Sequence, residues 1–352
     1  MPGQRQPRIV LGLMVLGPPG SPGARLTSID DFRTALDMFQ ERGYTELDTA
    51  RAYINGLQES FTREAGWKER GLAIATKVYP IQPGAHEPET LAKSIETSLR
   101  ELGTDCIDTF YLHAPDRSVP FSLTLAALDA LHKAGKFKRL GLSNYASFEV
   151  AEIVMLCAHN GWVRPSVYQG IYNVLFRTIE LELVPTCRRY GIAIEIYSPT
   201  GGGFLAGRFA SKDDVPSEGR YVRGSPVEHL TRGRYFRNGI IEGARMIREA
   251  SEARGLEPLE VAVRWLVHHS VLKLGGNGGG DGDGDGIVIG FSNLKQLRNS
   301  LDYVERAPLP ADLVTVLDQA WRTAKTDVDT YWQMPMQYTY DAQESLFGPG
   351  SK

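Results

Sequence analysis

Cysteines are few in this chain, and long apolar runs are missing. Cys106, Cys157 and Cys187 are the three cysteines in 352 residues, and none forms a C-x-x-C pair, which excludes a disulfide framework. A reducing, cytoplasmic setting is therefore predicted. No apolar run reaches the roughly 18 residues that a transmembrane helix requires. Residues 9–17 lack a convincing small-residue cleavage site, so we interpret this run as a strand rather than a signal peptide.

An excess of charge of either sign is also missing. Lys and Arg number 39 and Asp and Glu number 42, which gives a formal net charge of −3. A chain so close to neutral lacks the basic surface of a nucleic-acid binder or of a protein that docks on anionic membranes. Hydrophobic residues make up 42% and charged residues 23%, a composition typical of a globular protein with a full core.

A convincing metal-binding pattern is the last absence. The three aspartates of residues 281–285 are spaced like the start of an EF-hand loop, but Ser292 stands at the twelfth position, where that loop needs a glutamate. His268 and His269 are adjacent, so on a helix they would not face the same way. The sequence therefore predicts no metal site.

What the sequence does contain is an alternation of short apolar runs with amphipathic stretches. Ser28 can cap the first stretch, with Asp31 at the third position, and Gly103 stands where a helix end favours glycine. The apolar runs cover residues 9–17, 46–50, 72–78, 107–114, 139–144, 167–172, 193–199 and 286–291, and the helical stretches cover 28–44, 89–102, 147–159, 181–190, 243–254, 258–268 and 294–304.

Strictly alternating strands and helices predict an α/β fold with right-handed crossovers and a parallel sheet. Eight repeats in about 300 residues fit a closed (β/α)8 TIM barrel better than an open doubly wound sheet. The first strand is followed by no G-x-G-x-x-G, which a dinucleotide-binding open sheet would usually have.

We expect one catalytic domain over residues 1–321, with long loops at the C-terminal face of the barrel. Residues 211–237 are polar and arginine-rich, as expected of a long loop after the seventh strand, and the Gly/Asp tract 275–286 is predicted to be a flexible insertion. The tail over residues 322–352 has little helical period, and we expect it to pack over the substrate pocket or on a partner. Its five aromatic residues are Tyr331, Trp332, Tyr338, Tyr340 and Phe347.

Four polar residues lie at or just after the ends of neighbouring predicted strands. Asp48, Lys77 and His113 should converge at one rim of the barrel, with Tyr53 just above them. A tyrosine is a poor acid at neutral pH, but an adjacent ammonium stabilises the phenolate and a carboxylate holds that ammonium in place. The tyrosine can then donate a proton to an oxygen that gains charge, while the imidazole donates a hydrogen bond to the same oxygen.

This set resembles the catalytic tetrad of the aldo-keto reductase superfamily. The resemblance starts with the spacing of Asp48-Thr49-Ala50 and Tyr53 and continues, in chain order, over residues 8–305. Its later parts are residues 141–144, Gln169, residues 197–199, residues 203–208 and residues 290–292. The motifs around Tyr53, residues 112–116 and the loop after the seventh strand look most like the aflatoxin-aldehyde/succinic-semialdehyde reductase branch.

The resemblance implies a role for each matching residue. Tyr53 would be the general acid, Lys77 its neighbour, Asp48 the partner of the lysine, and His113 the group that orients the carbonyl. The cofactor would be NADPH, with the nicotinamide held by Ser143, Asn144, Gln169 and Tyr197, and the remaining contacts made by Ser198, Pro199, Arg208, Gly290, Ser292, Gln296 and Ser300. Lys295 or Arg298 would join them around the 2′-phosphate. An aldehyde or ketone would be reduced to an alcohol, and the branch tends toward homodimers.

Two residues depart from the pattern of the superfamily. The cofactor motif commonly ends Gln-Leu-x-x-Asn, but here Ser300 stands in place of the asparagine, so either Ser300 or Asn299 makes the adenine contact. Glu195 lies two residues before Tyr197 in the same strand, and period-2 alternation points both into the barrel. A carboxylate in that place needs a partner.

Other interpretations stay open at this point. A regulatory NADPH-binding subunit on the same fold, similar to the potassium-channel β subunits, would keep the cofactor site with little turnover. Physiological oxidation of an alcohol would use the same four residues, whereas a barrel hydrolase would need paired carboxylates or metal ligands that the rim lacks. The substrate pocket would be walled by Met14, Tyr53, Tyr79, the 211–237 loop and the tail, with Arg232, Arg234 and Arg237 as candidates to meet a substrate carboxylate.

Overall fold

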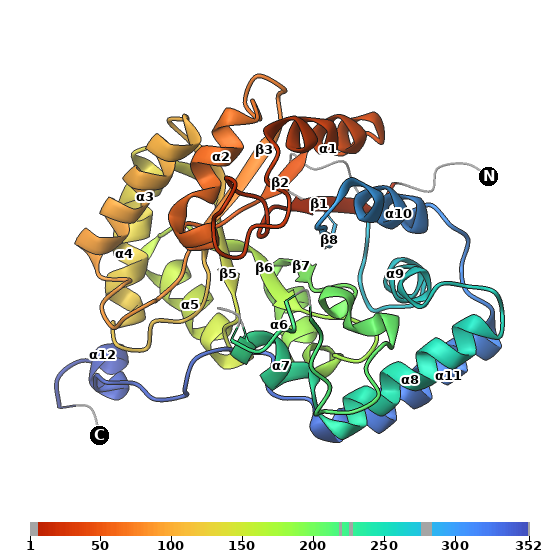
Figure 1. Ribbon diagram of the computed structural model, residues 1–352. Helices are drawn as coiled ribbons and strands as arrows, with labels where there is room; N and C mark the ends of the chain where they lie inside the picture. The colour runs from red at the N-terminus through yellow and green to blue at the C-terminus, as the bar shows by residue number, and fades with distance from the viewer. Residues whose placement is uncertain (1–5, 218–219, 225–227, 276–283, 351–352) are drawn as a thin grey trace.

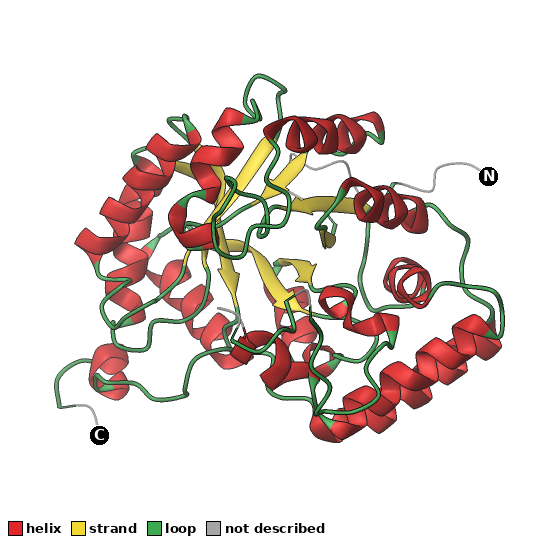
Figure 2. Ribbon diagram, in the orientation of Figure 1, coloured by secondary structure: helices red, strands yellow, loops and turns green. Residues whose placement is uncertain are grey.

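Eight parallel strands form a closed barrel in the computed structural model, which describes residues 6–217, 220–224, 228–275 and 284–350 (Figures 1 and 2). Each strand pairs with the next along the chain, and β8 pairs with β1. The predicted (β/α)8 TIM barrel is therefore confirmed. The strands are β1 (Arg8–Gly12), β2 (Glu46–Asp48), β3 (Ala73–Val78), β4 (Ile107–Leu112), β5 (Phe137–Ser143), β6 (Pro165–Ile171), β7 (Ala193–Tyr197) and β8 (Gly286–Gly290).

Helices surround the barrel (Figure 2). They are α1 (Ile29–Glu41), α2 (Gln58–Glu64), α3 (Pro88–Leu102), α4 (Phe121–Lys133), α5 (Ser147–Asn160), α6 (Leu183–Tyr190), α7 (Glu228–Tyr235), α8 (Asn238–Glu252), α9 (Pro258–His268), α10 (Leu294–Val304), α11 (Ala311–Ala324) and α12 (Ala342–Phe347). The predicted caps are confirmed: Ser28 accepts a hydrogen bond from the Asp31 backbone N–H, and Gly103 ends α3 in the left-handed conformation.

Two of the barrel helices carry no amphipathic signal and were absent from the predicted set. Helix α4 is apolar over most of its circumference, so the 3.6-residue stripe that marks a surface helix is blurred. Helix α2 is short and buries polar side chains instead, including Gln58, Glu59 and Thr62. Glu59 accepts hydrogen bonds from Arg51 and Thr76, which explains how a carboxylate is tolerated there.

The start of α8 was predicted five residues too late. The helix begins at Asn238 rather than at Gly243, and it packs along α11. A Cβ on Gly239 would lie 2.7 Å from the Thr323 carbonyl oxygen, and one on Gly243 would lie 2.9 Å from that of Ala320. These glycines therefore permit the close approach of two helices and do not end one.

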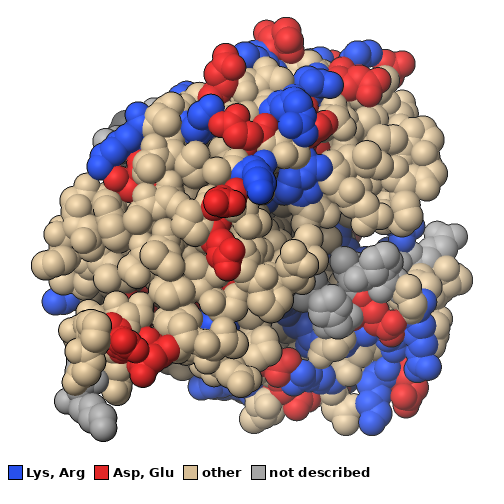
Figure 3. Space-filling model, turned by 90° about the vertical axis from the view of Figure 1, so that its left-hand side faces the viewer, with Lys and Arg blue, Asp and Glu red and all other residues tan. Residues whose placement is uncertain are grey.

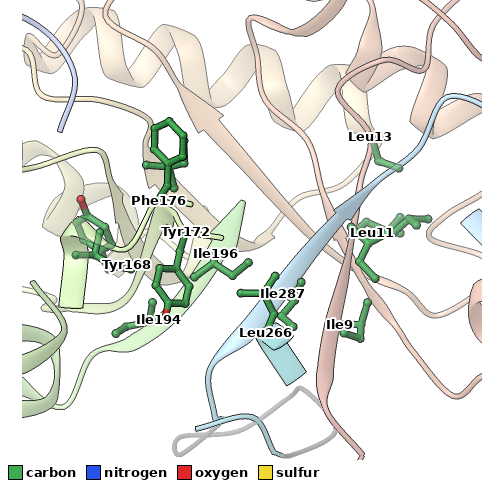
Figure 4. Packing of buried hydrophobic residues seen from close by; sticks show 14 of the residues in the cluster. Ile9, Leu11, Leu13, Tyr168, Tyr172, Phe176, Ile194, Ile196, Leu266 and Ile287 are labelled. Carbon is green, nitrogen blue, oxygen red and sulfur yellow. The ribbon is translucent and has the colours of Figure 1, made fainter. Parts of the chain in front are cut away.

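The strands present apolar side chains to the helices and polar side chains to the barrel interior. Ile9 and Leu11 of β1, Ile194 and Ile196 of β7, and Ile287 of β8 belong to the buried apolar cluster (Figure 4). The alternate positions turn inward, and they carry Arg8, Glu46, Asp48, Lys77, Tyr111, Gln169 and Glu195, all of them buried. The interior is thus charged, and its side chains bond to one another.

The remaining sequence expectations have mixed outcomes. The predicted loop over residues 211–237 contains a helix, α7, in its described part. The predicted domain end at residue 321 falls inside α11, which continues to Ala324. Cys157 and Cys187 are buried, whereas Cys106 lies just before β4 and is partly exposed. Most of the 275–286 insertion falls outside the described residues.

At the end of that insertion, the Asp285 carboxylate accepts hydrogen bonds from Arg188 and from the backbone N–H groups of Ile194 and Lys273. No helix within the described ranges is long and apolar enough to cross a membrane. In that same part of the chain, no cluster of side chains could hold a metal ion. On the face shown in Figure 3, acidic and basic side chains are interspersed.

Candidate active site

An ion pair between Asp48 and Lys77 forms the floor of the site. Asp48 is the last residue of β2, and Lys77 lies near the end of β3, so both side chains reach the C-terminal rim of the barrel. Lys77 Nζ is 2.6 Å from each Asp48 carboxylate oxygen and donates to the Thr49 carbonyl oxygen at 2.8 Å. Burial lowers the pKa of Lys77, but Asp48, Tyr53 and Glu195 together outweigh burial, so the pKa is raised and the amine stays protonated.

Tyr53 lies above this pair at the start of a short 3₁₀ turn, η1 (Tyr53–Gly56). Ile54 and Asn55 in that turn have φ values of 48° and 53°, the left-handed region that is unusual for such residues. Lys77 Nζ is 5.3 Å from the centroid of the Tyr53 ring. Burial raises the pKa of Tyr53, and Lys77 acts to lower it, as the sequence predicts; burial is the larger effect, so the phenol stays protonated.

The His113 imidazole stands between two tyrosines at the end of β4. Its ring meets Tyr53 and Tyr79 edge-on, with centroid distances of 5.8 and 5.4 Å. Burial lowers the pKa of His113 well below its ordinary value, and the Lys77 ammonium lowers it further, so the imidazole is neutral at physiological pH. Its Nδ1 atom is buried without a partner in the described part of the chain.

The four residues predicted to hold the nicotinamide lie on three consecutive strands. Ser143 ends β5 and is followed by Asn144, Gln169 lies on β6, and Tyr197 ends β7. Asn144 Nδ2 donates to Ser143 Oγ and to the His113 carbonyl oxygen, both at 2.8 Å, and the Tyr197 hydroxyl donates to Asn144 Oδ1 at 2.8 Å. Gln169 Nε2 donates to Asp48 Oδ1, also at 2.8 Å. The predicted cofactor residues are therefore bonded directly to the predicted catalytic ones.

The loop that follows β7 brings the next predicted residues to the same rim. Ser198 adopts a left-handed φ of 59°, and Pro199 leads into three glycines at 201–203 with φ between 59° and 92°. Only glycine adopts such a run without strain. Arg208 follows this turn and is exposed.

The last predicted cofactor residues lie at the end of β8 and on α10. Gly290 ends β8, and Asn293 caps α10 by accepting a hydrogen bond from the Gln296 backbone N–H at 2.9 Å. Ser292 donates to Gln296 Oε1 through both its backbone N–H and its hydroxyl. Ser300 lies four residues after Gln296, so the two share a helix face. A helix N-terminus of this kind, with Lys295 and Arg298 exposed beside it, suits an anion.

Two of the three candidate arginines in the 211–237 loop are engaged elsewhere. Arg232 donates to the carbonyl oxygens of Lys212, Asp214 and Tyr221, which ties the loop together. Arg237 pairs with Asp329. The Arg234 guanidinium differs because it lies beside Tyr197 and Tyr235. Burial lowers the pKa of Arg234, but these two tyrosines raise it above its ordinary value.

The C-terminal tail also reaches the rim. The Gln333 backbone N–H donates to the Asn144 carbonyl oxygen at 3.0 Å, and its side chain lies 3.4 Å from the Tyr197 hydroxyl and 3.3 Å from that of Tyr79. Arg117 fixes this segment, since its Nη1 atom donates to the carbonyl oxygens of residues 333, 334 and 335, each at 3.0 Å. Sequence reasoning missed Gln333 and Arg117, because no local pattern pairs residues so far apart.

Sequence reasoning also missed Arg8. The partner that the alternation pattern requires for Glu195 is this arginine, whose guanidinium lies between the carboxylates of Glu46 and Glu195. Starting the first strand at residue 9 hid the signal. With β1 beginning at Arg8, the same period-2 alternation turns Arg8, Val10 and Gly12 into the barrel.

Comparison with known proteins agrees with the fold. The family model of the aldo/keto reductases matches residues 8–322. An aldo-keto reductase of Pseudocercospora fijiensis is 38% identical over 301 residues, which cover 84% of this chain and 99% of the relative. The aldo-keto reductase pigE of Monascus ruber is 38% identical over 340 residues, covering 92% of this chain and 96% of the relative. Aflatoxin B1 aldehyde reductase member 2 of Homo sapiens is 37% identical over 339 residues, covering 93% and 90%. The chain therefore belongs to the aldo/keto reductase family of carbonyl-reducing oxidoreductases.

Proposed function

We propose that this chain reduces aldehydes or ketones to alcohols with NADPH, and that Tyr53 supplies the proton. The observation that carries the proposal is the stack of Asp48, Lys77, Tyr53 and His113 at one rim of the barrel. The ammonium is held by a buried carboxylate on one side and faces the phenol ring on the other. No other described part of the chain joins a tyrosine, a buried cation and a neutral imidazole in this way.

Each residue of this set has a task that follows from its protonation state. Tyr53 stays protonated because burial raises its pKa, so it has a proton to give. Lys77 stabilises the phenolate that remains after transfer, and Asp48 keeps the ammonium in place. Neutral His113 donates a hydrogen bond to the substrate oxygen and orients the carbonyl, and it keeps this role at mildly acidic pH because its pKa is low.

The residues present fit a nicotinamide dinucleotide phosphate. Ser143, Asn144 and Gln169 form a polar ledge beside the Tyr53 site, and Tyr197 offers an aromatic face. Gln169 Oε1 accepts no hydrogen bond within the described residues, so it is available to a carboxamide. The capped N-terminus of α10, with Lys295 and Arg298, suits the 2′-phosphate. When bound, the cofactor supplies the hydride, and the protein supplies position and charge.

We infer that the substrate is an aldehyde or ketone with an aromatic or apolar body. Tyr79, Met334 and Gln333 lie together at the rim next to the cofactor ledge, with the Tyr79 hydroxyl 3.3 Å from Gln333 Oε1 and 3.5 Å from Met334 Sδ. Arg234 is the one candidate arginine of the loop without a described carboxylate bond, which also suits an acidic group on the substrate. The human relative is named for its action on aflatoxin B1 aldehyde.

The test is turnover of 4-nitrobenzaldehyde and succinic semialdehyde, followed by the loss of NADPH absorbance, in the wild type, Tyr53→Phe and Tyr79→Phe. We expect Tyr53→Phe to abolish turnover without weakening NADPH binding, because the phenol acts only in the proton transfer. Tyr79→Phe removes a hydroxyl beside the same imidazole and should retain measurable turnover. NADPH binding without turnover in the wild type would instead favour a binding subunit, and faster alcohol oxidation would favour the reverse reaction.

A further inference from the structure

The carboxylate of Glu195 lies inside the barrel, one layer below the candidate active site. Glu195 is opposite Gln169 in the register of β6 and β7, so the two side chains are neighbours on the inner face. Glu195 Oε2 accepts a hydrogen bond from the Tyr111 hydroxyl at 2.8 Å and from Gln169 Nε2 at 3.2 Å. The carboxylate therefore contacts a residue that we propose to hold the cofactor.

Glu195 is held in place from below. Arg8 pairs with Glu195 and with Glu46, and the three charges are buried. Gly286 of β8 lies next to both Arg8 and Glu195 and has no side chain to crowd them. A Cβ at this position would lie 3.4 Å from both Arg8 Nη1 and Glu195 Cγ. Burial raises the pKa of Glu195, but Arg8 and the hydrogen bonds from Tyr111 and Gln169 outweigh it, and the pKa is lowered. Glu195 is therefore ionised and can only accept hydrogen bonds.

The amide of Gln169 is fixed by two such acceptors. Its Nε2 atom lies 2.8 Å from Asp48 Oδ1 and 3.2 Å from Glu195 Oε2, one acceptor for each amide hydrogen. Burial raises the pKa of Asp48 and the Lys77 ammonium offsets part of that effect; the ion pair with Lys77 at 2.6 Å, whose own pKa is raised, leaves Asp48 an acceptor as well. A flipped amide would point Oε1 at two carboxylates, which is strongly unfavourable.

We propose that Glu195 is a positioning residue, which holds the Gln169 amide with Oε1 free to accept a hydrogen bond from the carboxamide NH2 group of the nicotinamide. The inference rests on the proposed function. Asp48 alone does not settle the orientation, because a neutral neighbour at position 195 could donate to Oε1 and compete with Asp48 for the amide. The second carboxylate removes that alternative.

The test compares Glu195→Gln with Glu46→Gln. Each variant replaces one carboxylate partner of Arg8 by an amide of the same size, but Glu46 does not contact Gln169. The dissociation constants of NADP+ and of 2′-phospho-ADP-ribose, which has no nicotinamide, are measured by fluorescence titration. We expect Glu195→Gln to weaken NADP+ binding about tenfold, the worth of one hydrogen bond, and to leave 2′-phospho-ADP-ribose unchanged. Glu46→Gln should change neither.

A double-mutant cycle shows whether Glu195 acts through Gln169. In a Gln169→Met background, Glu195→Gln should have no further effect on NADP+ binding, because no amide is left to orient. Should Glu195→Gln be too unstable to purify, Glu195→Asp keeps a negative charge for Arg8 but withdraws the carboxylate from Gln169, and it should weaken NADP+ binding with the same selectivity.

Three results would overturn the inference, and they differ from one another. Wild-type affinity of Glu195→Gln for NADP+ would show that the orientation of Gln169 does not depend on Glu195. Equal weakening of NADP+ and 2′-phospho-ADP-ribose would show a general structural effect. Failure of the wild-type chain to bind NADP+ would refute the proposed function itself.

Discussion

Arg117→Met is the substitution that should reveal how the C-terminal tail is attached. Arg117 and Glu149 are 4% and 0% exposed, and they form a two-point ion pair with distances of 2.8 and 2.9 Å. The remaining nitrogen of the guanidinium donates to the carbonyl oxygens of residues 333–335. One side chain thus joins the start of α5 to the tail segment that reaches the rim.

The expected loss of stability is about 3–5 kcal/mol, the usual cost of breaking a buried ion pair by removing one partner. Methionine fills much of the space, so the cost comes mainly from the unpaired Glu149 carboxylate. That carboxylate keeps only the Ala146 backbone N–H at 2.8 Å and the Tyr338 hydroxyl at 2.6 Å. In the double variant Arg117→Met, Glu149→Gln no charge is left unpaired, so its loss should be smaller than the sum of the single losses by about 1–3 kcal/mol.

Urea unfolding of the wild type, both single variants and the double variant gives the four free energies of this cycle. Chymotrypsin cleavage at the tail aromatics reports the attachment directly and should accelerate in Arg117→Met. Additive losses, or a loss below about 1 kcal/mol for Arg117→Met, would refute the reasoning, because they would mean that the pair is neither buried nor coupled in solution.

Further predictions concern pH, packing and the cofactor. Burial lowers the pKa of His86 to about 4 from 6.5, so the unfolded chain binds a proton that the folded chain does not. About 2 kcal/mol should be lost between about pH 7 and 5, and urea unfolding of His86→Phe should lack this part of the slope. Gly141→Ala places a Cβ 2.3 Å from the buried Tyr111 ring and should cost about 1–3 kcal/mol or more in the same assay. Lys295→Ala with Arg298→Ala should raise the dissociation constant of NADPH about tenfold and leave that of NADH unchanged.

Much of the fold could be predicted from the sequence because the barrel repeats one local pattern. Ser28 and Gly103 mark helix ends by their own backbone chemistry, and β-strands covered by helices appear as short apolar runs. Helix α4 escaped this reasoning because apolar residues also lie on its exposed side, as at Leu123, which removes the polar face from the pattern. The start of α8 could not be placed from its glycines, since their role depends on α11, which lies far along the chain.

Part of the candidate site could also be predicted from the sequence, and part of it could not. Asp48, Lys77 and His113 could be placed together because parallel strands end at one rim, and strand ends are visible in the sequence. The bonds that bring Gln333 to Asn144 and Tyr197 could not be foreseen, because the tail has no period that fixes its path. The net pKa of Tyr53 also required the structure, since burial opposes the ammonium and only geometry decides which is larger.

The charges inside the barrel explain why Glu195 and Arg8 occur together. Three carboxylates and three cations line the interior, namely Glu46, Asp48, Glu195, Arg8, Lys77 and Arg139. A buried charge without a partner costs several kcal/mol, so a carboxylate on β7 requires a cation within reach. On the adjoining β8 the neighbouring position is Gly286, which offers no side chain, and β1 lies beyond it. An arginine long enough to cross from β1 is therefore the counterpart of a glutamate on β7. The residues at positions 8, 195 and 286 therefore depend on one another: the glycine leaves the space that the arginine crosses to reach the glutamate.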